Sequence, residues 1–149
     1  MKSSKTAILN KVMHDTFKKG QLAHLEVEKQ ALMRGWITCY PTVECRFDMV
    51  IISPENKMYR AQVKYMDRTF PKTQGSLFLD LRKDTRNNGK RRPYTKSEID
   101  VILAYVPRIN KVIWLGPEIF DCVESLTFRI VPASPSYNGC SRMVQDFVW

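Results

Sequence analysis

The chain has 149 residues, 44% of them hydrophobic and 11% aromatic, which is enough for one domain with a sizeable core and excludes an intrinsically disordered chain. Its formal net charge of +9 favours an anionic partner, most often a nucleic acid, although a basic protein without such a partner would have the same composition. The sequence has no apolar run of about 18 residues and no apolar signal core near its first residues, so we expect no membrane span and a cytoplasmic location.

The first predicted element is a long helix over residues 5–33. Because glycine disfavours helix interiors, we expect a break near Lys18, Lys19 and Gly20. After the break, the helical period brings large apolar side chains to one face, with smaller ones beside them. These are Leu22, Leu25, Leu32 and Met33, next to Ala23, Val27 and Ala31. Gly35 is expected to end the helix as its C-cap.

Three predicted strands follow this helix. The first covers 36–41, and the other two, 46–52 and 58–64, form a hairpin around turn residues 53–56. With the turn centred on Glu55, Asp48 lies opposite Gln62, and Lys64 shares the face of Gln62. A carboxylate, an amide oxygen and an ammonium are therefore expected to meet on one patch, which suits binding of a divalent metal and activation of a water.

Asp48 is the most informative residue of the hairpin. Polar and apolar residues alternate along 58–65 as in any antiparallel sheet with one solvated face, so Gln62 and Lys64 alone do not indicate a site. Asp, however, is depleted from strands, and here it interrupts an apolar run. A buried, ionised carboxylate needs a cation or a metal as its partner.

A polar stretch, 67–94, follows the hairpin and contains a dense basic cluster. The residues that we expect to contact DNA are Arg82, Lys83, Arg86, Asn87, Asn88, Lys90, Arg91, Arg92 and Tyr94, with Arg60 on the preceding strand. Lysines and arginines that meet phosphates release counterions, and Arg and Asn can read purine edges in the major groove. The Asn-Asn-Gly tip suits a two-stranded ribbon that would fit this groove, and a solvated flexible loop is the alternative.

Two further strands, 99–106 and 111–115, precede a tail with an apolar run at 126–131 and a short helix or docked extension at 141–149. This order of elements predicts a single α/β domain over 1–149, with a central mixed sheet and helices against it. We expect the core to comprise about 5–66 and 95–131, and a basic insertion to comprise about 67–94.

Asp48 and the triplet Gln62-Val63-Lys64 resemble the PD-(D/E)XK nucleases. In that family a metal-binding Asp starts the second strand, and the third strand carries Asp, Glu or Gln, then any residue, then Lys. Lys19-Gly20 and Gly35-Trp36, at the two ends of the helix before the first strand, match as well, so the resemblance covers 19–65. It is strongest to the group I intron-encoded homing endonucleases of this class, which use the Gln version.

The resemblance implies a restriction-endonuclease-like fold with a basic DNA-binding loop or ribbon insertion. It also implies a site-specific double-strand DNA endonuclease, in a bacterium or an organelle, that uses Mg²⁺ or Mn²⁺. Asp48, the Gln62 side chain and the Val63 carbonyl would be metal ligands. Lys64 would orient or deprotonate the attacking water.

The family often has a metal-supporting Glu on the first helix, and a gapless match puts His24 in that position. We expect Glu26 to be the catalytic and metal-binding contributor, with His24 as the alternative. Glu26 falls among Leu22, Leu25 and Met33, where a carboxylate without a role would be costly.

Cutting both strands of a duplex with one site per chain is simplest for a homo-oligomer, either a dimer or a tetramer. Two alternatives stay open, namely a Holliday-junction resolvase-like nuclease and a non-catalytic nucleic-acid-binding module on the same fold. The basic charge fits all three functions, whereas the alignment of Asp48, Gln62 and Lys64 fits only the nucleases.

Overall fold

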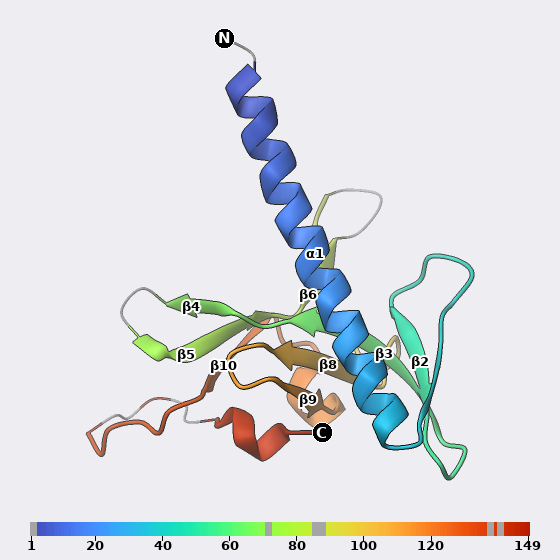
Figure 1. Cartoon of the computed structure of the whole chain (residues 1–149). Helices are drawn as coiled ribbons and strands as arrows, with labels where there is room; N and C mark the ends of the chain where they lie inside the picture. Colours follow the sequence, from blue (N-terminus) through green and yellow to red (C-terminus); the bar gives the residue numbers. More distant parts are fainter. Residues whose placement is uncertain (1–2, 71–72, 85–88, 137–138, 140–141) are drawn as a thin grey trace.

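The computed structural model describes residues 3–70, 73–84, 89–136, 139 and 142–149. Its centre is a five-stranded sheet in the order β1-β2-β3-β8-β9, crossed on one face by a long helix, α1 (Figure 1). The bounds are Ser3–Met33 for α1, Ile37–Cys39 for β1, Met49–Ile52 for β2, Met58–Tyr65 for β3, Val101–Val106 for β8 and Lys111–Leu115 for β9. Strands β3 and β8 are parallel and the other neighbours are antiparallel, which confirms the predicted mixed sheet.

A second sheet lies against the other face of the central sheet. It has three strands in the order β10-β5-β4, with bounds Ser125–Arg129, Thr73–Asp80 and Arg68–Phe70. A two-stranded ribbon of β6, Arg82–Asp84, and β7, Arg91–Pro93, extends from it. The short helix α2, Pro117–Phe120, and the 3-10 helix η1, Val144–Phe147, complete the described elements.

Helix α1 runs without a break through Gly20, so the predicted interruption is wrong. A Cβ at Gly20 would have open space around it, and an interior glycine costs a helix only about 1 kcal/mol, which packing of the following turns can offset. The predicted C-cap is confirmed. Gly35 has a φ of +72°, and the Gly35 and Trp36 amides donate to the carbonyls of Leu32 and Ala31.

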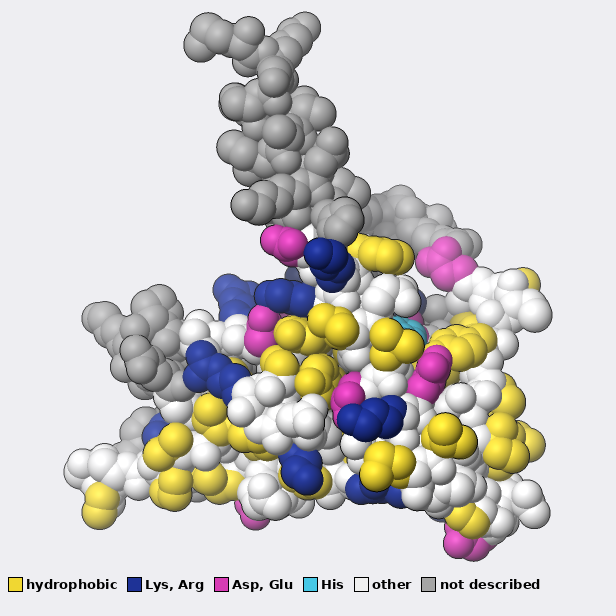
Figure 2. Space-filling model, viewed as in Figure 1, with side chains coloured by type: hydrophobic (Ala, Val, Ile, Leu, Met, Phe, Trp, Pro, Cys, Tyr) yellow, Lys and Arg dark blue, Asp and Glu magenta, His cyan; other side chains and the backbone are white. Residues whose placement is uncertain are grey.

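The helix packs through its small residues and not through its leucines. Ala23, Val27 and Ala31 are fully buried against the central sheet. Large side chains point outward instead, and Figure 2 shows apolar side chains along the outer surface of α1. The exposed fractions are 51% for Leu22, 59% for Leu25, 78% for Leu32 and 72% for Met33. The expectation that these leucines form the packing face is therefore wrong, because short side chains at i, i+4 and i+8 let the helix approach the sheet closely.

This packing predicts opposite sensitivities on the two faces of α1. Ala23→Leu should destabilise the protein by about 1–3 kcal/mol because the added side chain must displace β2 or β3. Leu25→Ala, two positions away on the exposed face, should change the free energy of unfolding by less than about 0.5 kcal/mol. Urea denaturation of both variants measures this, and equal losses would contradict the packing of α1.

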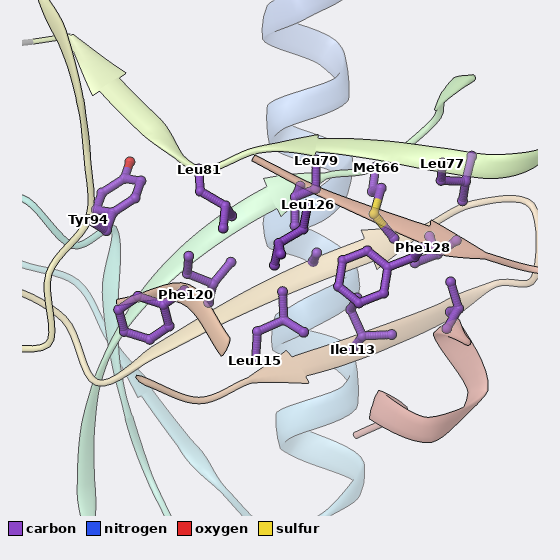
Figure 3. Packing of buried hydrophobic residues seen from close by; sticks show 14 of the residues in the cluster. Met66, Leu77, Leu79, Leu81, Tyr94, Ile113, Leu115, Phe120, Leu126 and Phe128 are labelled. Carbon is purple, nitrogen blue, oxygen red and sulfur yellow. The ribbon is translucent and has the colours of Figure 1, made fainter. Parts of the chain in front are cut away.

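The segment expected as a basic insertion, 67–94, lies largely within the fold. Leu77 and Leu79 on β5, together with Leu81, pack against Leu126 and Phe128 of β10 in the core between the two sheets (Figure 3). Only the ribbon of β6 and β7 carries the basic cluster. The three leucines stand at every second position and are buried, while Phe78 and Asp80 between them are half-buried, which is the pattern of a strand with one face in the core and not of a loop.

The tail docks on the chain's own core. Val148 forms a bridge with Ile113, and the Trp149 amide donates to the Val112 carbonyl at 2.9 Å. The predicted short helix is η1, whose Phe147 packs edge-on against Phe128. Of the helices that the structure describes, none combines the length and apolar character that crossing a membrane requires.

Candidate active site

The β2–β3 hairpin has the register that the sequence predicts. Met49 pairs with Ala61, and the Asp48 amide donates to the Ala61 carbonyl at 2.9 Å, so Asp48 stands opposite Gln62 at the entry to β2. The turn is closed by an Asn56 to Ser53 hydrogen bond and uses a left-handed Asn56, with φ of +64°. Asn tolerates this conformation, which is why the turn is centred where its composition suggested.

Polar atoms of Asp48, Gln62 and Val63 form a close hydrogen-bonded group. The Asp48 carboxylate accepts hydrogen bonds from the Gln62 side-chain amide and, at 3.0 Å, from the Val63 backbone amide. The same Gln62 nitrogen lies 3.4 Å from the Val63 carbonyl oxygen. The carboxylate and this carbonyl therefore converge on one point, which the Gln62 amide nitrogen occupies.

The other end of the Gln62 amide has no partner. Its side chain is only 6% exposed, and Oε1 is buried without a hydrogen bond to any described residue. A buried carbonyl oxygen left in this state is costly and rare. Within the described part of the chain, no three His, Cys, Asp or Glu side chains cluster as metal ligands, because this group relies on an amide and a backbone carbonyl.

Lys64 lies on the same side of β3 as Gln62, beneath the ribbon. Its ammonium donates to the Arg82 carbonyl at 3.4 Å and stands 5.2 Å from the centre of the Tyr94 ring. Burial lowers the pKa of Lys64, and the charges of Asp80 and Asp48 oppose that shift only in part. The charge of Asp48 thus acts on Lys64, which lies on the same side of β3 as Gln62, as the sequence predicts.

The helix places His24, and not Glu26, beside this group. His24 Nε2 is 3.8 Å from the Asp48 carboxylate, and its ring stacks on Tyr40 at a centroid distance of 6.2 Å. Glu26 instead accepts from Lys29 and Gln30, both at 3.2 Å, on the opposite flank of α1. Because Ala23, Val27 and Ala31 face the sheet, a rotation of 100° per residue turns His24 towards Asp48 and Glu26 away from it. The expectation for Glu26 rested on the wrong packing face.

Asp48 opens into a surface hollow of about 310 Å³. The loop between β1 and β2 forms one wall of this hollow, and Lys83 of the ribbon lies on another. The lining residues are Tyr40, Pro41, Thr42, Val43, Glu44, Cys45, Phe47, Asp48 and Lys83. Lys83 also donates to the Cys45 carbonyl at 3.0 Å, so the ribbon contacts the loop that leads to Asp48.

The structure places the residues expected to contact DNA in different environments. Arg82, Arg91 and Arg92 lie on the ribbon, each engaged with a carboxylate, and Lys83 and Lys90 lie beside them. Arg86, Asn87 and Asn88 lie outside the described residues. Tyr94 is 1% exposed and lies in the core, so the expected DNA contact is wrong for the side chain as the structure places it.

Arg60 is held away from this surface by its own chain. Its guanidinium donates to both oxygens of Asp100, each at 2.9 Å, and to the Ser97 carbonyl at 2.7 Å. Hydrogen bonds from Arg60 lower the pKa of Asp100, so the pair stays charged. These contacts suit a role in joining β3 to the segment before β8 better than the expected role in DNA binding.

Two residues near the site escaped the sequence analysis. Arg46 lies 4.6 Å from the centre of the Tyr94 ring, on which it stacks, and 3.2 Å from the Glu98 carboxylate. Among the neighbouring charges, that of Asp80 has the largest effect on the pKa of Lys64 and raises it. Asp80 interrupts an apolar strand just as Asp48 does, so the same pattern would have identified it.

The comparisons with known proteins agree with this geometry. The family model for PD-(D/E)XK endonucleases matches residues 14–146. Among solved structures, the bacterial homing endonuclease I-Ssp6803I is similar at a TM-score of 0.68 and 22% identity, over 89% of this chain and 88% of that one. A search of curated protein sequences gave no match. Nucleases of this family generally use divalent metals. The match over most of the chain, on a fold that brings Asp48, Gln62 and Lys64 together, shows that the chain belongs to the PD-(D/E)XK endonuclease family.

Proposed function

We propose that this endonuclease is a homing-type enzyme that cuts both strands of duplex DNA at a specific site, with Mg²⁺ or Mn²⁺ bound at Asp48. The observation that supports it best is the convergence of the Asp48 carboxylate and the Val63 carbonyl on the Gln62 amide, whose buried Oε1 has no hydrogen-bond partner among the described residues. The similar structure is named a homing endonuclease, which supports the same class of substrate for this chain. Such a substrate implies action where DNA is, in the bacterial cytoplasm or in an organelle.

The donor atoms fit a small, hard cation. Rotating the Gln62 amide by half a turn would exchange its nitrogen and oxygen and turn Oε1 towards Asp48 and the Val63 carbonyl. Three oxygens, from Asp48, Gln62 and the Val63 carbonyl, would then face one point, an arrangement that only a cation makes favourable. Mg²⁺ and Mn²⁺ prefer oxygen ligands, and Mg²⁺ keeps several waters.

When bound, the divalent cation would supply Lewis-acid polarisation of the scissile phosphate and a more acidic water. The chain's own residues would do the rest. Asp48 would contribute the anionic ligand, and the Gln62 side chain and the Val63 carbonyl would add neutral oxygens. Lys64, held under the ribbon by the Arg82 carbonyl, would orient the attacking water and offset negative charge on the phosphorane-like transition state.

His24 is the proposed helix contributor to this site. We expect His24→Ala to lower the cleavage rate by about tenfold to a hundredfold, the range typical for loss of a residue that supports a metal ligand. Glu26→Ala should leave the rate within about twofold, because its carboxylate contacts only Lys29 and Gln30. Single-turnover cleavage rates decide between the two, and the reverse order would restore Glu26 as the contributor.

The hollow beside Asp48 and the ribbon above it are the proposed DNA surface. Lys83 lines the hollow, and Arg82, Lys90, Arg91 and Arg92 continue the basic surface along β6 and β7. With one active site per chain, cutting two strands is simplest for a symmetric dimer or a tetramer, so we propose a homo-oligomer. Sedimentation of the protein on its DNA target would give the number of subunits.

A cleavage assay on a randomised duplex library with Mg²⁺ tests the proposed function. Sequencing of the ends should return one preferred site, cut in both strands with a constant stagger. Preference for a four-way junction over linear duplex would assign a resolvase-like role instead. Binding without any cleavage that depends on Asp48 would leave a non-catalytic nucleic-acid-binding module.

A further inference from the structure

Two carboxylates at the base of the ribbon, those of Asp80 and Glu98, each contact two arginines. Asp80 accepts from Arg82 through Nε at 3.1 Å and Nη2 at 3.2 Å, and from Arg91 through Nη1 at 2.9 Å. On the other side, Glu98 accepts from both terminal nitrogens of Arg92 and lies 3.2 Å from Arg46. Each carboxylate therefore serves two arginines.

The two carboxylates divide the ribbon between its faces. Arg82 pairs with Pro93 and residue 84 with Arg91, so Arg82 and Arg91 share one face of the ribbon. Lys83 pairs with Arg92, which puts these two residues on the other face. Asp80 thus holds the arginines of the first face, and Glu98 holds the arginine of the second.

The carboxylates are the more buried partners. Their side chains are 23% and 17% exposed for Asp80 and Glu98, against 49% and 47% for Arg91 and Arg92. Burial alone would raise the pKa of both carboxyl groups, but hydrogen bonds and charges from the arginines outweigh it and lower the pKa. Both acids are therefore ionised at neutral pH, and each offsets one of the two positive charges that it contacts.

A guanidinium binds a carboxylate and a phosphate in the same forked geometry. In the DNA-free chain, Asp80 takes the Nε and Nη2 of Arg82, and Glu98 takes the two terminal nitrogens of Arg92. A DNA phosphate must displace the acid or use the remaining N–H groups. An arginine already neutralised in this way adds little to the counterion release that drives non-specific binding.

We propose that Asp80 and Glu98 act as internal phosphate mimics that restrain the affinity of the ribbon for non-specific DNA. Exposed ion pairs contribute little net stability, so a duplex that presents several phosphates in the right places can displace both acids together. A duplex of the wrong shape engages fewer arginines and is released. This inference rests on the proposed DNA-binding function, and it concerns how the enzyme rejects wrong sites.

Glu98→Gln and Asp80→Asn test this inference, because each keeps the shape of the side chain and an oxygen acceptor while removing its charge. Binding to a random-sequence duplex without divalent metal is followed by fluorescence anisotropy across a range of salt concentrations. For each variant we expect the slope of log K against log salt to steepen by about 1, and the affinity near 0.1 M salt to rise about threefold to tenfold.

Glu55→Gln is the matched control. It makes the same change in net charge at the exposed tip of the β2–β3 hairpin, at the opposite end of these strands from Asp48, and should leave the salt slope unchanged. Adding Arg92→Gln to Glu98→Gln should return the slope towards the wild-type value. Thermal melting of each variant reports whether the ribbon stays folded.

Two results would overturn the inference. Variants that bind no better than Glu55→Gln would show that the carboxylates do not compete with phosphate. Variants that are folded but bind more weakly would show that the acids orient the arginines for DNA. Failure of the wild-type chain to bind DNA at all would instead count against the proposed function.

Discussion

Asp48→Asn should lower the rate of DNA cleavage by about a thousandfold or more while leaving the protein folded. The amide cannot provide the only anionic oxygen of the proposed metal site, and the loss of several kcal/mol of transition-state stabilisation corresponds to a factor of this size. Single-turnover rates at saturating Mg²⁺ measure it. Asp146→Asn, an exposed acid on η1, is the matched control and should cut at the wild-type rate.

Lys64→Met should produce a separate loss of about a hundredfold to ten-thousandfold, because it removes the buried ammonium that lies beneath the ribbon on the side of β3 that carries Gln62. The methionine fills the same space under the Tyr94 ring, so binding of DNA should survive. Lys111→Met at the exposed start of β9 controls for the loss of a positive charge. Full cleavage by either the Asp48 or the Lys64 variant would remove these residues from the mechanism.

Gln62→Glu should lower the stability of the metal-free protein and raise the affinity of the protein for the metal. The Gln62 amide now donates to Asp48, and a carboxylate in its place would put two negative charges in contact, at a cost of about 1–3 kcal/mol without metal. With Mg²⁺ present, the added charge should raise metal affinity by about tenfold, because ligand charge tunes affinity in oxygen-ligand sites.

The measurement is urea denaturation with and without Mg²⁺, together with calorimetric titration of the metal. Gln62→Met supplies the control, since it fills the volume without either the donor or the oxygen, and should weaken metal binding. If Gln62→Glu left both the metal-free stability and the metal affinity unchanged, Gln62 would not be a ligand.

The sequence predicted the β2–β3 hairpin because a turn and two strands fix their own register. Residues 53–56 determine the centre of the turn, and a period of two residues then determines which side chains are opposite Asp48. No distant part of the chain is needed for that inference. The position of Asp48 opposite Gln62 follows from local geometry alone.

The face of α1 was not predictable in the same way. Large leucines usually mark a buried face, but here the closest approach of helix and sheet selected Ala23, Val27 and Ala31. The side of the helix that meets Asp48 depends on the packing face, so the prediction of which helix residue lies beside Asp48 was affected as well. For that reason the structure places His24, and not Glu26, beside Asp48.

The sequence did not predict how short the basic ribbon is, nor how far carboxylates offset its positive charge. The stretch before it is polar overall, and only the alternation of Leu77, Leu79 and Leu81 marks a core strand. The sequence shows many arginines, whereas the structure shows Asp80 and Glu98 bound to them. Pairing between residues that are distant in sequence sets the effective charge of such a surface, and composition does not report it.

The most direct test of the metal site is anomalous diffraction from crystals soaked in Mn²⁺. We expect one strong anomalous peak about 2.0–2.3 Å from oxygens of Asp48, Gln62 and the Val63 carbonyl, with the Gln62 amide turned so that its oxygen faces the ion. A peak that lies away from Gln62, or a Gln62 amide that still donates to Asp48 when the metal is bound, would contradict it.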